Sequence, residues 1–425
     1  MLEPQRISTI GRKVVVGLLA LAPVIGCSER DRSVAPREVW DSAGVRMVRY
    51  AALPESESGL VRLAVRPRLV IGGDGAAPRT EFSEVAGVLR LSDGRLAVAD
   101  GGSSKIRFFN DGGVLVGEAG GFGDGPGEFR NLSFIGLLPG DSILTYDSSL
   151  RRLQVFDPQG RLAWGGQLTS DSPGNLVRIA VLGVLEDRKI LASQTASPTD
   201  ATVNGPERLP ELLVSFDWRA GTWDTLDVVR GPSQIIRATG GGYSMQGVPF
   251  GGHTDAASAK EIVAVVDSDL LGARVIRGGS LQTIIRIEQP AVPVTRDVLE
   301  DYVTRSLALW PSGSSSASRE QFRQRILNGP HGSSIPQVTS VEVDCTGRIW
   351  VNLGREPGRA QETFVVLSPE GDWVGKITFP PGLDRGTTGP DGPGMAICSD
   401  YVVGVWRDDL GVETIRVYAL MEIGK

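Results

Sequence analysis

The sequence is poor in the side chains that most enzymes use for metal binding and nucleophilic catalysis. It contains two histidines, His253 and His331, in 425 residues. A zinc site with three histidine ligands is therefore excluded, and no His-Glu-x-x-His or Gly-x-Ser-x-Gly motif is present. Both histidines lie in loops rich in glycine or serine, where a solvent-exposed histidine is the simpler interpretation. His331 is kept as a candidate binding residue.

Runs of lysine or arginine are also absent, and the formal net charge is −6. Proteins that bind nucleic acid neutralise its phosphates with a basic patch, so we expect no nucleic-acid partner. Long stretches with helical periodicity are scarce. The 55 glycines and 26 prolines are typical of many short strands joined by tight turns. The composition therefore favours an all-β fold.

Only three cysteines are present, and the first follows a short apolar run. Basic residues at positions 6, 12 and 13 precede this run, which covers residues 14–26. At about 1.5 Å per residue it is roughly 20 Å long, too short for the ~30 Å hydrocarbon core. It has the form of a signal peptide. The tetrad Val-Ile-Gly-Cys that ends at Cys27 resembles the bacterial lipobox, which implies cleavage before Cys27 and lipidation of this residue.

We therefore expect a lipoprotein signal peptide at 1–26, a flexible tether at 27–38 and a single folded domain at 39–425. Because Ser28 rather than aspartate follows the cysteine, the pattern resembles that of proteins sorted to the outer membrane. The expected location is the cell envelope, on the periplasmic or the surface side, with the lipid on Cys27 as the membrane anchor. The alternative is a soluble secreted protein in which Cys27 is incidental.

An internal repeat predicts the fold. The segment Asp-Gly-Arg-Leu-Ala-Val-Ala-Asp at 93–100 leads into an apolar strand and a turn that ends at Gly113. A second copy places Asp147 where the first has Asp100, and its turn ends at Gly160. A third copy covers 346–371. Short alternating strands with Gly and Asp turns, repeated every forty to fifty residues or so, are typical of four-stranded propeller blades.

Following this pattern predicts six blades, with seven as the alternative. The last unit has only three obvious strands, and Val61–Ile71 can supply its outer strand. N-terminal sequence would then close the ring and remove exposed sheet edges. The expected units cover residues 83–118, 130–168, 176–229, 243–289, 335–379 and 394–420.

The segment 93–100, together with Gly-Asp-Gly-Pro-Gly-Glu-Phe at 123–129, resembles NHL-like six-bladed β-propellers. The likeness is greater to exported bacterial propellers that carry both motifs. It covers about 39–168 and returns at 339–380. Most members of this group have no defined function, so the resemblance implies a fold and a compartment but no activity. The glycine-rich segment lacks the lysine and the following helix of a phosphate loop, which favours a crossing between blades.

Asp100 and Asp147 are candidate binding residues. In NHL-like blades the matching aspartate holds the loop to the third strand by accepting hydrogen bonds from backbone N–H groups and from Arg or Lys. That structural role is the first interpretation for both residues. Ligand binding is the second, because these loops lie on the face where propellers usually bind ligands.

Residues 295–328 break the rhythm of strands. Apolar side chains recur at helical spacing, and Ser-Arg-Glu-Gln at 318–321 indicates a capping box. We expect a helical insertion on the ligand-binding face. It would either cap the mouth of the central channel or pack on the rim.

Cys345 and Cys398 fall at corresponding turns of the last two units. Corresponding positions in adjacent sheets are roughly 10 Å apart, whereas a disulfide needs Cα atoms within about 7 Å. We therefore expect two separate buried thiols. The alternative is a disulfide, which an exported protein permits.

With no recognisable catalytic set, the sequence favours a monomeric, non-enzymatic binding module for a protein, peptide or glycan, without a cofactor. The alternative is a metal-dependent lactonase- or lyase-type propeller enzyme with a divalent cation, Ca²⁺, at the central axis. Glu84, at the start of the first inner strand, is the best-placed carboxylate for that role. The Glu-Gly-Pro segment of those enzymes is missing. A purely structural envelope component is the third possibility.

Overall fold

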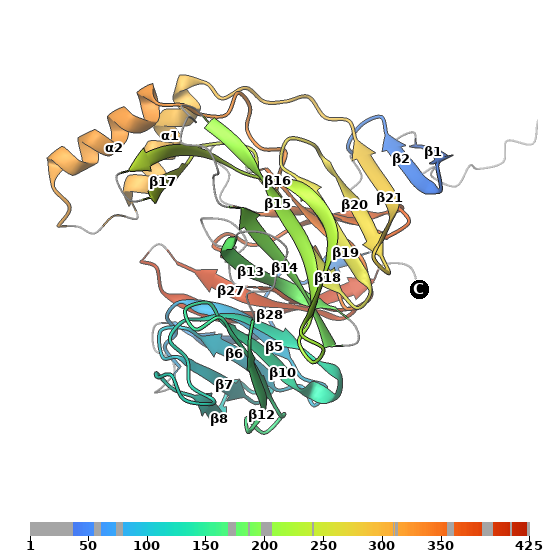
Figure 1. Ribbon diagram of the computed structural model, residues 1–425, viewed down its shortest axis with the longest axis vertical. Coiled ribbons are helices and arrows are strands. Elements are labelled where there is room, and N and C mark those ends of the chain that lie inside the picture. The colour runs from blue at the N-terminus through green and yellow to red at the C-terminus, as the bar shows by residue number, and fades with distance from the viewer. Residues whose placement is uncertain are drawn as a thin grey trace, which may run out of the picture. The chain divides into compact units, whose positions relative to one another are not determined.

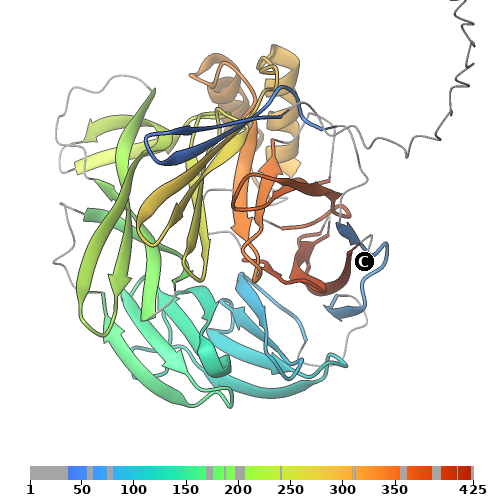
Figure 2. The same cartoon turned by 90° about the vertical axis from the view of Figure 1, so that its right-hand side faces the viewer.

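The computed structural model contains six β-sheets arranged as the blades of a six-bladed β-propeller (Figures 1 and 2). The predicted fold class and number of blades are therefore confirmed. The inner strands contact one another in the order β5, β9, β13, β18 and β22, and β26 contacts β5. The structure describes residues 37–54, 61–73, 80–168, 176–185, 188–196, 206–239, 242–308, 310, 313–354, 361–384, 394–408 and 410–422.

The first three blades are formed by residues 85–247. Blade 1 consists of β5 (Val85–Arg90), β6 (Leu96–Asp100), β7 (Lys105–Phe109) and β8 (Leu115–Gly120). Blade 2 consists of β9 (Leu132–Leu137), the short 3-10 turn Pro139–Asp141, β10 (Ile143–Asp147), β11 (Arg152–Phe156) and β12 (Leu162–Gln167). Blade 3 consists of β13 (Leu176–Leu185), β14 (Lys189–Ala196), β15 (Pro206–Asp217), β16 (Thr222–Thr239) and β17 (Gly242–Gly247).

The other three blades use C-terminal strands together with four N-terminal ones. Blade 4 consists of β18 (Thr254–Ala259), β19 (Ile262–Asp267), β20 (Gly272–Arg277) and β21 (Ser280–Ile287), extended by β2 (Val45–Tyr50) and β1 (Arg37–Ser42). Blade 5 consists of β22 (Val338–Val343), β23 (Ile349–Leu353), β24 (Thr363–Leu367) and β25 (Trp373–Thr378). Blade 6 consists of β26 (Ala396–Ile397), β27 (Tyr401–Arg407), β28 (Glu413–Glu422), β4 (Leu69–Gly72) and β3 (Val61–Leu63).

Apolar side chains between neighbouring blades form the core. In blade 1, Leu96 and Val98 pack toward blade 6, whereas Ala97 and Ala99 pack toward blade 2. This division follows from the two-residue period of a strand, which sends successive side chains to opposite faces. Because both faces of a blade are covered, second strands such as Leu96–Asp100 are buried along their whole length. Each large apolar side chain buried this way stabilises the fold by about 1.5–3 kcal/mol.

The repeated turn glycines lie against the neighbouring blade. Gly160 has a φ of 80°, and a Cβ atom on it would lie 3.0 Å from Cβ of Ala119 and 3.1 Å from the ring of Phe108. Gly113, at the matching turn of blade 1, has a φ of 79° and lies against Leu69. Both the left-handed backbone and the close approach require glycine. This explains why the two copies of the repeat have glycine at the same position of the turn.

The N-terminal sequence closes the ring, as predicted. β4 pairs with β28 in antiparallel register, with Leu69 opposite Val417. β3 extends the same pairing, with Leu63 opposite Leu420. This arrangement covers the outer edge of β28, which would otherwise present unpaired backbone groups.

Two strand pairings differ from the prediction or extend it. Residues 243–247 were expected to begin the fourth blade, but β17 pairs with β16 as a fifth strand of blade 3. β16 has 18 residues and is long enough to pair with both β15 and β17. The β1–β2 hairpin adds to blade 4 through parallel pairing of β2 with β21. Alternation of apolar and polar residues predicts a strand but not the strand with which it pairs.

The predicted helical insertion is present as α1 (Arg296–Ala308) and α2 (Ser316–Asn328). The cap of α2 is Ser315 rather than Ser318, and its side chain accepts a hydrogen bond from the backbone N–H of Ser318. Seen face-on in Figure 2, the two helices lie at the edge of the ring rather than over its centre, as the rim alternative expects. Neither helix is long and apolar enough to cross a bilayer.

The expectation of two separate thiols is wrong, because Cys345 and Cys398 form a disulfide. Their Cα atoms are 4.9 Å apart. The backbone N–H of Cys345 donates a hydrogen bond to the carbonyl of Ile397 in blade 6 at 3.0 Å. Near the inner strands the two blades are thus in direct backbone contact. The spacing of about 10 Å that separates stacked sheets does not apply there.

Candidate ligand-binding site

The aspartates at the ends of the second strands hold loops in place. Asp100 is 2% exposed, and its carboxylate accepts hydrogen bonds from the Ser103 hydroxyl at 2.8 Å and the Arg107 guanidinium at 3.1 Å. It also accepts a bond from the backbone N–H of Ser83 at 3.3 Å. These contacts fit the structural interpretation of Asp100. They engage its carboxylate within the fold, and we assign it no ligand contact.

Asp147 occupies the matching position in blade 2 and is fully buried. Its carboxylate accepts backbone hydrogen bonds from Arg130 at 2.6 Å, Asn131 at 3.1 Å and Leu150 at 2.8 Å. Three N–H donors satisfy a buried carboxylate without an ion pair. Asp147 therefore connects residues 130–131, which lie between blades 1 and 2, with the loop that precedes β11.

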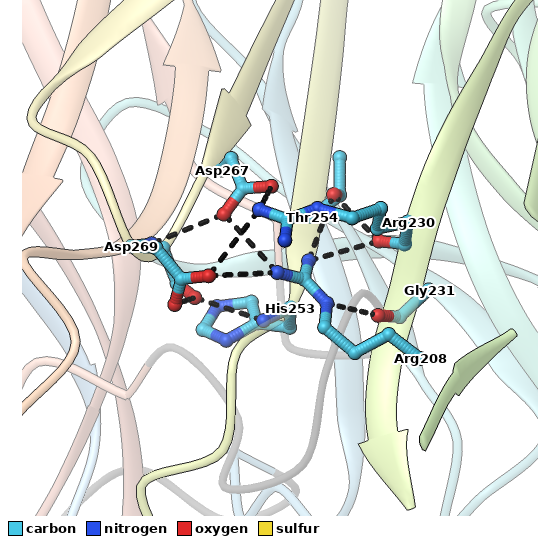
Figure 3. Close-up of polar contacts among 8 residues, drawn as sticks. Arg208, Arg230, Gly231, His253, Thr254, Asp267 and Asp269 are labelled. Atoms are coloured by element: carbon cyan, nitrogen blue, oxygen red, sulfur yellow. Dashed lines mark hydrogen bonds and ion pairs between the residues drawn. The ribbon is translucent and has the colours of Figure 1, made fainter. Parts of the chain in front are cut away.

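A third aspartate, Asp267, ends the second strand of blade 4 and anchors a network of charges (Figure 3). Arg208 Nη1 lies 3.2 Å from Oδ1 of Asp267 and 3.1 Å from Oδ2 of Asp269. Arg230 Nη2 lies 2.8 Å from Asp267 and 3.3 Å from Asp269. The two arginines come from β15 and β16 of blade 3, so this charge network joins blades 3 and 4.

The pKa of Asp267 is lowered by this network. Burial by itself raises the pKa, but the backbone N–H of Asp269 and the guanidinium groups of Arg230 and Arg208 outweigh it. Arg208 also donates to the carbonyls of Gly231 at 2.7 Å and Arg230 at 2.9 Å. Arg208 therefore connects the carboxylates of blade 4 with the backbone of β16.

The loop that follows β17 runs beside this network. The backbone N–H of Ser233 donates to the carbonyl of Gly252 at 2.7 Å. The next residue, His253, is half-buried, and its Nε2 lies 2.9 Å from the carbonyl oxygen of Thr339. This histidine, like the charge network, holds the loop 248–253 against blades 4 and 5.

The same loop, 248–253, contacts the helical pair α1–α2. The rings of Phe250 and Tyr302 are 5.4 Å apart, and the pair has a small apolar core that includes Leu299, Val303 and Ile326. Gly332 donates its N–H to the carbonyl of Pro249 at 2.9 Å. A Cβ atom at Gly332 would overlap the carbonyl oxygen of Phe250. The helices are therefore held through a backbone contact that only glycine permits.

A cleft of about 280 Å³ lies between α2 and the β16–β17 hairpin. Its two walls come from different parts of the chain. Apolar, amide and cationic side chains line it, together with two glycines: Ile235, Arg237, Gln246, Gly247, Pro249, Gln324, Arg325, Ile326, Asn328, Gly329 and Pro330. This lining contains two arginines and no carboxylate.

Both arginines of the cleft are exposed. Within the described residues no carboxylate lies within ion-pair distance of Arg237 or Arg325. The guanidinium of Arg325 lies 5.1 Å above the ring of Phe322. The amide of Gln324 is already engaged by Glu320 and Asn328. The cleft therefore offers uncompensated positive charge beside apolar walls.

The last turn of α2 lines the cleft with Arg325, Ile326 and Asn328. The final four carbonyl groups of a helix have no partner within the helix. Gly329 follows in extended backbone, with φ −89° and ψ 177°, so the turn does not close with a left-handed glycine. A ligand with both N–H donors and carboxylates matches these carbonyls and the two arginines.

The other residues predicted from the sequence lie apart from the cleft or outside the described chain. Glu84 is exposed with a φ of 54°, and its carbonyl accepts a bond from Gly101. His331 is exposed and its Nδ1 lies 2.8 Å from the carbonyl of Gly332. In the described ranges no group of three His, Cys, Asp or Glu side chains is placed to hold a metal ion. Cys27 lies outside the described residues.

Sequence reasoning missed both the charge network and the cleft. Asp267 had a signal, because Ile-Val-Ala-Val-Val-Asp at 262–267 repeats the pattern of a buried strand that ends in aspartate. Arg208, Arg237 and Arg325 had none, since isolated arginines in polar segments are common. Their role depends on which strands and helices meet.

Comparison with known proteins finds no family model and no curated protein that matches the sequence. Among solved structures, a member of the DUF4221 family from Bacteroides vulgatus is 10% identical with a TM-score of 0.51, covering 87% of this chain and 100% of that one. A protein from Bacteroides fragilis described as exported is 12% identical with a TM-score of 0.44, covering 89% and 100%. A gluconolactonase from Xanthomonas campestris is 10% identical with a TM-score of 0.40, covering 84% and 99%. Of these three similarities, the one to the DUF4221 protein supports the fold, and the fold alone.

Proposed function

We propose that this chain is an exported, lipid-anchored β-propeller that binds a partner without catalysis. The signal-peptide pattern of residues 14–26 and the resemblance of the tetrad ending at Cys27 to a lipobox support export and attachment to the cell envelope. The cleft between α2 and the β16–β17 hairpin supports the binding role. The observation that carries this role is the pair of arginines, Arg237 and Arg325, which line the cleft without a carboxylate partner in the described chain.

The chemistry of the cleft favours a peptide segment of a partner protein that carries carboxylates. Carboxylates pair with guanidinium groups in a bidentate geometry that gives both affinity and orientation. Peptide N–H groups match the open carbonyls at the end of α2. Ile235, Ile326 and the two prolines provide an apolar surface for the neighbouring side chains. Of a protein, a peptide and a glycan, an acidic peptide satisfies all three features.

A direct test measures binding of fluorescent hexapeptides by anisotropy. One set carries two glutamates in an apolar background, and a matched set carries two glutamines. We expect the glutamate peptides to bind at least about tenfold more tightly, because each charge-assisted bond contributes about 1.5–3 kcal/mol. The double variant Arg237→Glu/Arg325→Glu is expected to remove this preference. Equal binding of both sets by the unaltered protein would overturn the proposal.

Two further variants test whether binding depends on the cleft itself or only on the net charge of the protein. Arg151→Glu/Arg219→Glu changes the net charge by the same amount at exposed sites on blades 2 and 3, and should retain the preference. Gly332→Ala leaves the arginines intact but disturbs the contact with Phe250, so it should weaken binding without removing the preference for glutamate. Turnover of a lactone that requires added Ca²⁺ would instead support the metal-dependent alternative.

A further inference from the structure

A second cationic surface lies at the seam where β3 and β4 close the ring. β3 and β4 both pair with β28, and residues 64–68 connect them. The backbone N–H of Ala64 donates to Ala419 at 2.9 Å, and that of Arg68 donates to Val417 at 2.7 Å. Residues 65–67 between these two bonds bulge out of the sheet. We call residues 64–68 the seam bulge.

The side chains on and beside the seam bulge are unusually exposed. Val65 is 93% exposed, which is the largest exposed fraction of any large apolar side chain in the described part of the chain. Met421 on the paired strand is 49% exposed and lies opposite Arg62. Arg62, Arg66 and Arg68 are all exposed. The surface thus combines a protruding valine with three guanidinium groups.

These arginines differ from most others in the protein. Many arginines of the described chain form ion pairs, as Arg90 does with Asp400 at 3.5 Å. Within the described residues, none of the three arginines at the seam forms an ion pair. Asp111 and Asp400 line a small crevice together with Arg68. In a chain of net charge −6, this is a local concentration of uncompensated positive charge.

We propose that the seam bulge docks on a membrane surface of anionic phospholipids. Basic residues close to a bilayer are attracted by anionic headgroups. An exposed apolar side chain at the tip of a loop gains free energy by entering the headgroup region. Pro67 fixes the backbone dihedral φ next to Arg66 and Arg68, so the bulge loses little conformational freedom on docking. One exposed valine on the same bulge as Arg66 and Arg68, without an apolar groove, favours a charged lipid surface over a folded protein partner.

The proposal does not depend on lipidation of Cys27 or on the peptide cleft. It predicts a second contact with the bilayer that orients the ring relative to the membrane. A basic patch is the kind of second signal that strengthens attachment of an anchored protein to a bilayer. The seam bulge would thus determine which edge of the propeller faces the lipid.

The test is sedimentation with vesicles of phosphatidylglycerol and phosphatidylcholine, compared with vesicles of phosphatidylcholine alone. Every variant carries the same N-terminal apolar segment, so binding to neutral vesicles gives the background. We expect the full chain to bind anionic vesicles about tenfold more than neutral ones at low salt, and to lose this excess at high salt. The triple variant Arg62→Glu/Arg66→Glu/Arg68→Glu should lose it at low salt as well.

The matched control is Arg151→Glu/Arg188→Glu/Arg219→Glu, which makes the same charge change at other exposed sites. It should bind anionic vesicles as the unaltered protein does. If both triple variants lose binding equally, or if neither does, the seam bulge is not the docking site. Val65→Asp is a single exposed change that tests insertion, and we expect it to reduce the excess about fivefold. A melting temperature for each variant verifies that the fold is retained.

Discussion

The guanidinium group of Arg208 in blade 3 lies 3.2 Å from the carboxylate of Asp267 in blade 4. The side chain of Arg208 is 11% exposed and that of Asp267 is 23% exposed. An ion pair shielded to this degree keeps more of its attraction than one on the open surface. Arg208 also lies against Gly252 of the loop 248–253, which contacts the helical pair.

The first prediction concerns Arg208→Ala. This change removes one donor from the carboxylates of Asp267 and Asp269, which Arg230 still contacts, and from the carbonyls of Gly231 and Arg230. We expect a loss of about 2–4 kcal/mol in the free energy of unfolding, because removing one partner exposes the desolvation cost of the others. Urea denaturation measures it. Arg219→Ala, at an exposed site, should change stability by less than about 0.5 kcal/mol, and an equal effect of both variants would contradict the prediction.

The second prediction is a pH dependence at Asp267. Because its pKa is lower in the folded protein than in the unfolded chain, the ionised form stabilises the fold above the unfolded value of about 4. That stabilisation is lost as the pH falls through the lowered pKa of the folded state. Asp267→Asn should therefore reduce the melting temperature at pH 7, and the difference from the unaltered protein should shrink toward pH 3. A constant difference across this range would show that the charge is not responsible.

The third prediction is a pH dependence at Glu211 with the opposite sign to that at Asp267. Burial raises the pKa of Glu211 on β15, even though the hydroxyl groups of Ser193 and Thr195 lower it in part. An acid whose pKa is raised on folding destabilises the fold once the pH exceeds its unfolded value of about 4.3. Glu211→Gln should therefore raise the melting temperature at pH 7 and have little effect near pH 4. Unchanged or lower stability at pH 7 would refute this assignment.

The fourth prediction concerns the disulfide between Cys345 and Cys398. The cysteines are 53 residues apart in sequence, and a cross-link of that span removes conformational freedom from the unfolded chain. Reduction should destabilise the protein by about 2–4 kcal/mol, as measured by thermal unfolding with and without a reducing agent. The double variant Cys345→Ser/Cys398→Ser should already have the lower melting temperature. A further response of this variant to reductant would mean that the effect arises elsewhere.

The blades were predictable because a propeller repeats one local pattern. Strands that end at Asp100 and Asp147, with turn glycines at 113 and 160, follow from residues close together in sequence. Ring closure by Val61–Ile71 could also be predicted, since blade 6 lacked a strand and an exposed edge is unfavourable. Local spacing and a missing strand were sufficient for these features.

The remaining features depend on contacts between distant segments. Residues 243–247 have the pattern of a strand, but only the length of β16 makes them part of blade 3. The disulfide depends on how closely two inner strands approach, which no spacing in sequence reports. The cleft depends on the position of α2 over β16 and β17. Because α2, β16 and β17 are separate segments of the chain, no local sequence pattern predicts the cleft between them.

The pairing of Leu69 with Val417 has a consequence for the order in which this protein folds. During synthesis from the N-terminus, β4 emerges near the beginning and its partner β28 near the end. Blade 6 therefore cannot form until almost the whole chain is available, and closing so long a loop is slow. Until then the first blades lack a neighbour on one side and leave apolar surface uncovered. We expect ring closure to be the last and rate-limiting step of folding, and chaperones to be most important before it.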